Sequence, residues 1–331
     1  LNIFATLAHH PARLRRWLVF AAHVLSRNRL TPRDRELLIL RVGVRCNSKY
    51  EFGQHTVIAQ RSDISIEEIE RTKVGPDDPA WSAFDAALLR AADELHDDSR
   101  ISDATWADLR KTYSDQQVME LFFTSAQYQL VSMALNTLGI QIEPEAVDFM
   151  PSDLPLPATA RRPTGQRLST PRVAPIPASA WTPEQRAMIT PQLRPNGEAL
   201  NLYTTMLNHP KLYGPRARFG SYLQRDSLLD SETRELLIMR TAHNIRASYE
   251  WSHHEESATN AGLSPAHISA IATGPSASIW TAKQRAVLTA ADELRREAFI
   301  SDATWAELAR YYGIKERIEI VYTVGGYTRT G

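Results

Sequence analysis

The sequence predicts an all-α protein built from two tandem helical domains. Segments that lie 199 residues apart repeat one another without a gap: RELLILR (35–41) returns as RELLIMR (234–240), and ISDATWADL (101–109) as ISDATWAEL (300–308). Within these segments apolar residues recur three and four positions apart, which is the period of an amphipathic helix. Strand-like alternation with hairpin turns is hard to find in either copy.

Helix-start signals place the elements of each copy. TPRDRELLILRVGVR opens with Thr31 as the N-cap, Pro32 at the first helical position and Asp34 three residues after the cap. Asp230 occupies the cap position in the second copy. Further along, DDPAWSAFDAALLRAADEL carries the helical apolar period, and SDATWADLRKTY begins with another cap, Ser102. We therefore expect the same series of helices twice.

A proline-rich segment separates the copies. Residues 144–195 hold 11 of the 19 prolines, a density that cannot continue a helix or a central strand. We interpret this segment as an extended linker between domains at 1–143 and 196–331. The first copy continues through LVSMALNTLGIQIEPE, whereas the sequence given stops at Gly331, so we expect the last helix of the second copy to be incomplete.

Composition limits the classes of partner. Lys and Arg together number 38 and so do Asp and Glu, and this balance gives no overall field for nucleic acid. The most apolar run, WLVFAAHVL, is far shorter than the roughly 20 residues of a membrane-spanning helix. Cys46 is the only cysteine, which excludes an internal disulfide, and we interpret it as a small buried apolar residue. We expect a cytoplasmic protein that binds neither nucleic acid nor membrane.

Each copy places a carboxylate and a histidine four residues apart. SKYEFGQH (48–55) contains Glu51 and His55, and SYEWSHHEES (248–257) contains Glu250 and His254. Positions four apart lie on one face of a helix. A pair of this kind is either an acid/base site or an ordinary solvated helix pair.

A third ionisable group lies 15 residues before each of these carboxylates, at Glu36 in the first copy and Glu235 in the second. On one straight helix it would be about 20 Å away. A break around CNSKY and NIRASY would fold the second helix back on the first and bring the three groups together.

These residues resemble the signature of the AhpD-like superfamily, which includes the carboxymuconolactone decarboxylases: Glu, eleven residues, a small residue, two residues, a reactive position, three residues, His. The resemblance covers both copies and leaves out mainly the linker. It implies two AhpD-like helical domains packed against each other and assembly into a homo-oligomer. In the peroxidase branch the small and reactive positions are cysteines, whereas here they are Ser48 and Glu51, then Ala247 and Glu250. Thiol peroxidase chemistry is therefore disfavoured.

The resemblance implies proton transfer without a cofactor. The leading hypothesis is a lyase or isomerase that acts by general acid/base catalysis on a small organic acid or lactone. A histidine would donate or accept the proton, and the glutamate four residues before it would orient the ring. The residues that match the motif are Glu36, Glu51 and His55 in the first copy and Glu235, Glu250 and His254 in the second.

Five neighbouring residues are candidates for substrate binding. The hydroxyl groups of Tyr50 and Tyr249 either bind substrate or belong to aromatic rings that pack between helices. The guanidinium groups of Arg41 and Arg240 either bind a substrate carboxylate or pair with the upstream glutamate of their own copy. His253 has no counterpart in the first copy, where Gln54 stands. If only one copy is active, we favour the second.

Two other classes of function remain open. In the first, the chain is a degenerate, non-catalytic binding or assembly module, and its Glu and His side chains are sealed in the core with no pocket beside them. In the second, it is an oxidoreductase that depends on a metal or another cofactor. The potential metal ligands are Glu250, His253 and His254, or Glu51 with His55. Adjacent histidines diverge by about 100° on a helix, so we assign no metal site.

Overall fold

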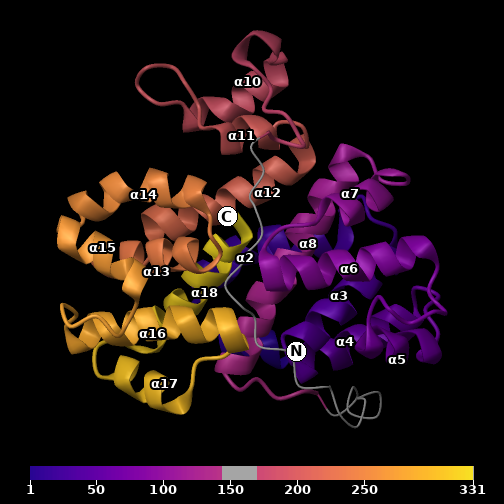
Figure 1. Cartoon of the computed structure of the whole chain (residues 1–331), viewed down its shortest axis with the longest axis horizontal. Coiled ribbons are helices and arrows are strands. Elements are labelled where there is room, and N and C mark those ends of the chain that lie inside the picture. Colours follow the sequence, from indigo (N-terminus) through magenta and orange to yellow (C-terminus); the bar gives the residue numbers. More distant parts are fainter. Residues whose placement is uncertain (144–169, 331) are drawn as a thin grey trace.

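The computed structural model describes residues 1–143 and 170–330, and within them the chain forms 17 α-helices and no strand. The all-α prediction is confirmed. Figure 1 shows the first copy in indigo to magenta beside the second copy in orange to yellow, with the long helices α8 and α18 between them. The proline-rich segment 144–169 of the predicted linker lies outside the described residues.

The two copies contain the same eight helices in the same order. The first copy consists of α1 (Asn2–Leu7), α2 (Pro11–Ser26), α3 (Pro32–Arg45), α4 (Lys49–Gln60), α5 (Ile66–Val74), α6 (Ala83–Asp98), α7 (Asp103–Arg110) and α8 (Asp115–Thr137). The second consists of α11 (Asn201–Met206), α12 (Pro210–Ser221), α13 (Ser231–Asn244), α14 (Ser248–Asn260), α15 (Pro265–Thr273), α16 (Ala282–Glu297), α17 (Asp302–Ala309) and α18 (Ile314–Thr330).

The predicted caps start the helices that later carry the site. The Thr31 hydroxyl accepts a hydrogen bond from the Asp34 amide at 3.1 Å, and the Asp230 carboxylate accepts one from the Thr233 amide at 2.8 Å. Caps of this type stabilise a helix by about 1 kcal/mol each. They fix the first turns of α3 and α13, and Glu36 and Glu235 follow directly after those turns.

The predicted break between the two site helices is present in both copies. α3 ends at Arg45 and α4 begins at Lys49, and Asn47 between them has a left-handed φ of 48°. In the second copy Arg246 takes the same conformation, with φ of 56°. Asparagine tolerates this region better than most residues. The turn folds α4 back against α3, and α14 against α13.

The described part of the predicted linker, 170–195, is not wholly extended. Residues Pro183–Ile189 form the helix α10, and in this respect the prediction is wrong. Thr182 caps the helix by accepting from the Gln185 amide at 3.1 Å. Pro183 occupies the first helical position, where a proline costs no hydrogen bond. The proline density therefore did not predict an extended conformation correctly here, because Pro183 occupies a position at which a helix tolerates proline.

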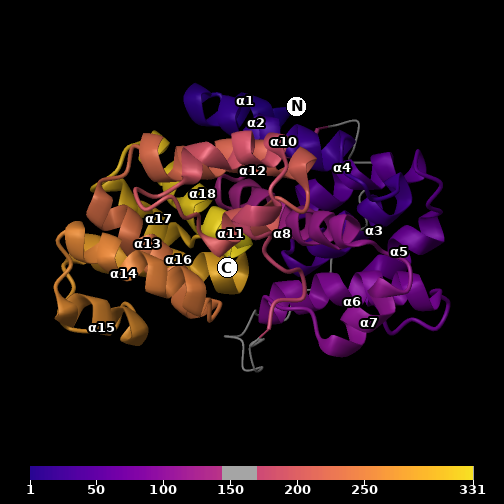
Figure 2. The same ribbon diagram turned by 90° about the horizontal axis from the view of Figure 1, so that it is seen from above.

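The copies meet along two helix pairs, α8 with α18 and α2 with α12. Figure 2 shows α8, α12 and α18 near the middle of the molecule. Across this contact His209 Nε2 lies 2.9 Å from Glu120 Oε1, and His10 Nε2 lies 2.8 Å from Glu319 Oε1. These two pairs are equivalent under the repeat, so each copy offers its histidine to the other copy's glutamate. The contact therefore has the reciprocity of a twofold symmetric dimer interface.

Glu319 is the more heavily bonded of the two carboxylates. Its Oε1 accepts from the Tyr222 hydroxyl at 2.7 Å and lies 2.7 Å from Arg13 Nη2, and its Oε2 accepts from the Ser227 hydroxyl at 2.9 Å. Burial alone would raise the pKa of Glu319, but the charge of Arg13 and these hydrogen bonds lower it below its usual value. The carboxylate therefore stays ionised in the interior.

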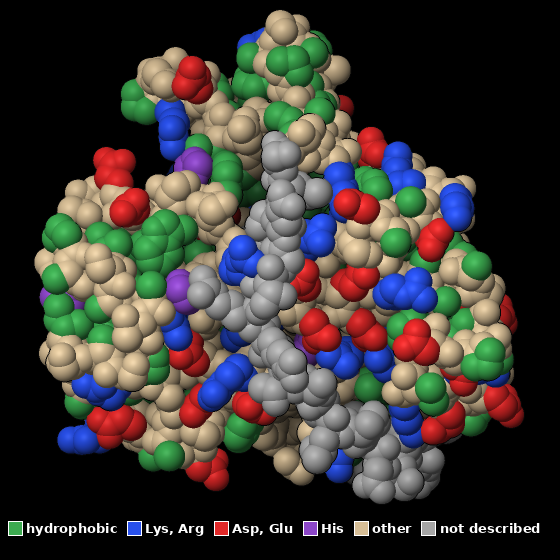
Figure 3. Space-filling view, viewed as in Figure 1, with side chains coloured by type: hydrophobic (Ala, Val, Ile, Leu, Met, Phe, Trp, Pro, Cys, Tyr) green, Lys and Arg blue, Asp and Glu red, His purple; other side chains and the backbone are tan. Residues whose placement is uncertain are grey.

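The surface agrees with the balanced charge of the chain. Figure 3 shows acidic and basic side chains interspersed over the face seen in Figure 1. No helix among the described residues is long and apolar enough to cross a membrane.

We expect Glu319→Gln to lower the free energy of unfolding by about 3–5 kcal/mol at pH 7, because it leaves the buried Arg13 without a counter-charge. Urea denaturation monitored by circular dichroism measures this. The difference between wild type and variant should shrink as pH falls below 4.5, since a carboxylate with a lowered pKa loses its contribution only under acid conditions. Glu307→Gln is the control. Glu307 belongs to a surface ion pair with Arg310, so this change should leave the midpoint of urea unfolding unchanged. Equal stability of wild type and Glu319→Gln would contradict the role of Glu319 as the counter-charge of Arg13.

Candidate active site

In the first copy the three predicted groups come together between α3 and α4. His55 Nδ1 lies 2.6 Å from Glu36 Oε2, and His55 Nε2 lies 2.9 Å from Glu51 Oε1. All three side chains are buried. The ring of Tyr128, from α8, packs edge-on against the imidazole with 4.9 Å between ring centroids. Both nitrogens of His55 are therefore engaged by carboxylates.

The two carboxylates hold His55 in its charged form. Burial alone would lower the pKa of His55, but Glu36 and Glu51 raise it to about 10. The pKa of Glu36 is lowered, because the charges of His55 and Arg35 outweigh the opposing effect of burial. At neutral pH this cluster is an imidazolium clamped between two carboxylates.

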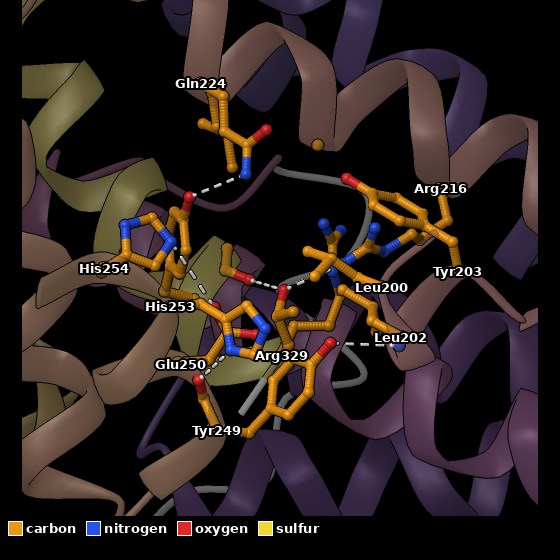
Figure 4. A pocket seen from close by; sticks show the side chains of 15 residues that line it. Leu200, Leu202, Tyr203, Arg216, Gln224, Tyr249, Glu250, His253, His254 and Arg329 are labelled. Atoms are coloured by element: carbon orange, nitrogen blue, oxygen red, sulfur yellow. Dashed lines mark hydrogen bonds and ion pairs between the residues drawn. The ribbon is translucent and has the colours of Figure 1, made fainter. Parts of the chain in front are cut away.

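In the second copy the same three residue types adopt a looser arrangement. His254 Nδ1 lies 2.7 Å from Glu235 Oε2, but His254 Nε2 is 3.7 Å from Glu250 Oε2, which is too long for a hydrogen bond. Glu250 Oε1 is buried and has no hydrogen-bond partner among the described residues. Tyr327 packs edge-on against His254, as Tyr128 does in the first copy. Figure 4 shows His254, Glu250 and the side chains around them.

Glu250 differs from its counterpart in its electrostatic surroundings. Burial raises the pKa of Glu250 above its usual value, and the charges of His254, Arg216 and His253 only partly oppose this effect. A buried carboxyl group with a raised pKa holds its proton more tightly than an exposed one. The second copy therefore combines such a carboxyl group with a histidine whose Nε2 faces it without a hydrogen bond.

Both copies have an opening beside the Glu and His pair. In the first, a cavity of about 250 Å³ contacts Glu51 and His55 and is walled mainly by apolar side chains: Trp17, Leu18, Leu25, Ile58 and Val131. In the second, a small pocket of about 50 Å³ contacts Glu250 and His254, and a hollow of about 440 Å³ contacts Glu235 and His254. The sealed core expected of a degenerate module is not found in either copy.

The two tyrosines use their hydroxyl groups within the protein. The Tyr50 hydroxyl donates to Glu143 Oε1 at 2.9 Å, and the Gln54 amide donates to Glu143 Oε2 at 2.6 Å. The Tyr249 hydroxyl accepts from the Leu202 amide at 3.3 Å. These contacts give both tyrosines a structural role at the rim of the pockets.

His253 lies on the pocket wall of the second copy. Its ring stacks on Tyr249 with 4.2 Å between centroids, and its Nδ1 lies 2.8 Å from the Tyr249 carbonyl oxygen. Nδ1 therefore donates to the backbone, and the ring is fixed in a plane beside the pocket. In the parts of the chain that the structure describes, no group of three His, Cys, Asp or Glu side chains is arranged to hold a metal ion.

The two predicted arginines lie elsewhere. Arg41 binds Asp93 through Nε and Nη2 at 2.6 and 2.7 Å, and Arg240 binds Asp292 at 2.6 and 2.8 Å. The expected partner inside the protein was the upstream glutamate, and that expectation is wrong. The aspartates belong to the repeated AADEL segments of α6 and α16, which pack on α3 and α13. The aspartate fills the fork of each guanidinium, and neither arginine lines the pockets described above.

The only cysteine is remote from this chemistry. Cys46 is buried at the end of α3, and burial raises the pKa of its thiol to about 12. The thiol is therefore protonated at neutral pH and inaccessible, as the interpretation of a small buried apolar residue predicted.

One family profile, that of the carboxymuconolactone decarboxylase family, matches residues 11–94 and again 210–293, once in each copy. The two matched segments contain all six Glu and His positions and together cover about half of the chain. The chain belongs to the carboxymuconolactone decarboxylase family. It is a tandem member with two family domains, as the resemblance implied. No curated protein and no solved structure matched the chain.

Three residues around these sites were not among the predicted ones. Glu143, beyond α8, accepts hydrogen bonds from Tyr50 and Gln54 beside the first site, and Arg216 and Arg329 line the small pocket of the second. A signal for the arginines was present in the repeat, because their counterparts in the first copy are Trp17 and Leu130. A charge that replaces an apolar residue at a matched position marks a place where the copies differ in chemistry.

We expect His55 to remain doubly protonated from pH 6.5 to well above neutrality and to titrate near pH 10, as measured by NMR of the imidazole nitrogens. Because the pKa of His55 is raised on folding, the contribution of its protonation to stability should be complete below about pH 6.5 and lost as pH approaches 10. Glu51→Gln removes one of the two carboxylates and should lower the titration midpoint. A wild-type midpoint below pH 7 would contradict the clamped imidazolium.

Proposed function

We propose that the chain is a cofactor-independent lyase or isomerase that transfers protons on a small organic acid or lactone, with the second copy as its principal site. The observation that carries this proposal is the separation of His254 from Glu250. At 3.7 Å the imidazole Nε2 and the carboxyl group are not bonded to each other, and both contact the same pocket. The corresponding distance of 2.9 Å in the first copy leaves no such freedom.

Each group has a role that follows from its surroundings. Glu235 accepts a hydrogen bond from His254 Nδ1, and in the neutral imidazole this leaves Nε2 with a lone pair toward the pocket. Nε2 can then remove a proton from a carbon next to a carbonyl group. Glu250, with its raised pKa, can deliver a proton to carbon. In an isomerisation the two act in turn on different carbons of one substrate. The proton gained by Nε2 then returns to Glu250, 3.7 Å away, which restores both groups.

A decarboxylation needs the same groups in a different order. When the bond between the substrate carbon and its carboxyl group breaks, its electron pair stays on the substrate as an enolate and carbon dioxide leaves. Glu250 then gives its proton to the carbon that lost the carboxyl group, and water restores the proton on Glu250. His254 beside it would stabilise the enolate oxygen when the substrate places that oxygen at Nε2. The family name supports this reaction type but not a particular substrate.

The first copy has a different role in this proposal. His55 has both nitrogens occupied by carboxylates, so it is a poor base at neutral pH. Its apolar cavity of about 250 Å³ is nonetheless large enough for a small ligand. We assign a binding role to the first copy. The alternative of a non-catalytic binding module thus applies to this copy only. A homo-oligomeric assembly and a cytoplasmic location stay predictions from the sequence.

Unsaturated lactone acids and β-keto acids are the substrates to test, with carbon dioxide release and deuterium incorporation from D₂O followed by NMR. Glu250→Gln and His254→Ala should each lower kcat by about 10²- to 10⁴-fold, the usual contribution of one acid or base. The matched changes Glu51→Gln and His55→Ala in the first copy should have much smaller effects. The rate should fall as pH rises through the raised pKa of Glu250, since the acid must be protonated. If the double variant His254→Ala, His55→Ala turns over every candidate substrate as fast as wild type, this mechanism is excluded.

A further inference from the structure

Two arginines that line the second pocket stand at positions where the first copy has apolar residues. Where the first copy has Trp17 on α2, the second has Arg216 on α12, and where the first has Leu130 on α8, the second has Arg329 on α18. Both arginines line the small pocket that contains Glu250 and His254 (Figure 4). The duplication has thus kept the Glu and His positions and placed two cations beside only one of the sites.

Neither arginine has a carboxylate partner among the described residues. Arg216 is 5% exposed and Arg329 is 8% exposed, so both are held inside the protein. Among the described residues, the Nε atoms of both arginines and Nη1 of Arg329 have no hydrogen-bond partner, and Arg216 Nη2 donates only a long bond of 3.4 Å to the Thr330 hydroxyl. A buried charge without a partner is costly, which distinguishes this pair from the buried arginines that bind aspartate.

Aromatic rings position these guanidinium groups without satisfying them. Arg329 lies 4.5 Å from the ring centroid of Phe20 and 4.7 Å from that of Phe219, and Arg216 lies 5.8 Å from that of Tyr203. Stacking of this kind fixes the plane of a guanidinium and offsets part of the free-energy cost of burying its charge. The N–H groups around its edge stay free to bind an anion in the same plane.

The two cations also act on each other. Burial lowers the pKa of Arg329 well below its usual range, and the nearby charge of Arg216 lowers it further. Glu250 is close enough for its pKa to respond to Arg216, yet no ion pair joins the two within the described residues. An anion bound between the arginines would remove this repulsion.

We propose that Arg216 and Arg329 form a carboxylate-binding subsite in the second copy, so that this site takes an acid, whereas the matched apolar pocket of the first copy takes an uncharged group. The inference rests on the proposed function for its placement beside the reacting groups. A carboxylate is the anion favoured here because a guanidinium fork matches its two oxygens. The pocket of about 50 Å³ has room for one such group and little more.

The rest of the substrate has an adjoining space. Leu200, Gln224 and His253 line both the small pocket and the hollow of about 440 Å³. A molecule anchored by its carboxylate at the arginines can therefore extend past His254 into the hollow. This places the carbons next to the carboxyl group beside Glu250, where a proton would be delivered.

Isothermal titration calorimetry of the full chain with acetate, and with acetamide as its neutral counterpart, tests the subsite without any turnover. Wild type should bind acetate at least tenfold more tightly than acetamide. Arg216→Met and Arg329→Leu should each weaken acetate binding at least tenfold. Leu130→Met, at the matched position of the first copy, and Arg186→Met, which removes an exposed arginine, should leave acetate binding unchanged. Circular dichroism confirms that each variant is folded.

The results separate this inference from the proposed function. Equal binding of acetate and acetamide, no binding of acetate, or acetate binding unchanged in both arginine variants would overturn the subsite. If Arg216→Met does not fold, Arg216→Lys keeps the charge but loses the fork, and it should still weaken acetate binding severalfold. Acetate binding that depends on both arginines in a protein that turns over no candidate acid would uphold the subsite and reject the enzymatic proposal.

Discussion

The two buried glutamates at the contact between the copies constrain the whole molecule. Glu319 is 0% exposed and relies on His10 and Arg13 from the first copy, and Glu120 is equally buried and relies on His209 from the second. A carboxylate in that position is tolerated only while these partners are present. α2, α8, α12 and α18 must therefore keep their mutual positions, and α8 and α18 in turn carry the tyrosines that pack on the two site histidines.

Within this shared frame, small differences give the two sites different chemistry. His55 and His254 are held in the same way by the glutamate of the preceding helix, at 2.6 and 2.7 Å. The second carboxylate lies at 2.9 Å in one copy and 3.7 Å in the other. Because electrostatic interactions in a buried site are strong, this difference of less than 1 Å separates a closed ion cluster from a histidine and a carboxyl group that are not hydrogen-bonded to each other.

Much of the fold and part of the site could be predicted from the sequence, and the reason is that they depend on local rules. Caps, helical periodicity and the 199-residue repeat placed the helices, and the break after α3 followed from the need to bring Glu36 to His55. The partner of Arg41 could not be predicted, because Asp93 lies 52 residues away and only the packing of α6 on α3 joins them. The environment of Arg216 and Arg329 likewise depends on burial, which no spacing of residues reveals.

Joining the two copies in one chain has a consequence for how such a site can change. In an assembly of identical subunits every substitution occurs in all sites at once, so an arginine in place of Trp17 would enter each pocket and abolish its apolar wall. Here the counterparts at 17 and 216, and at 130 and 329, are encoded separately. One gene can therefore keep an apolar pocket in one half while the other half acquires positive charge.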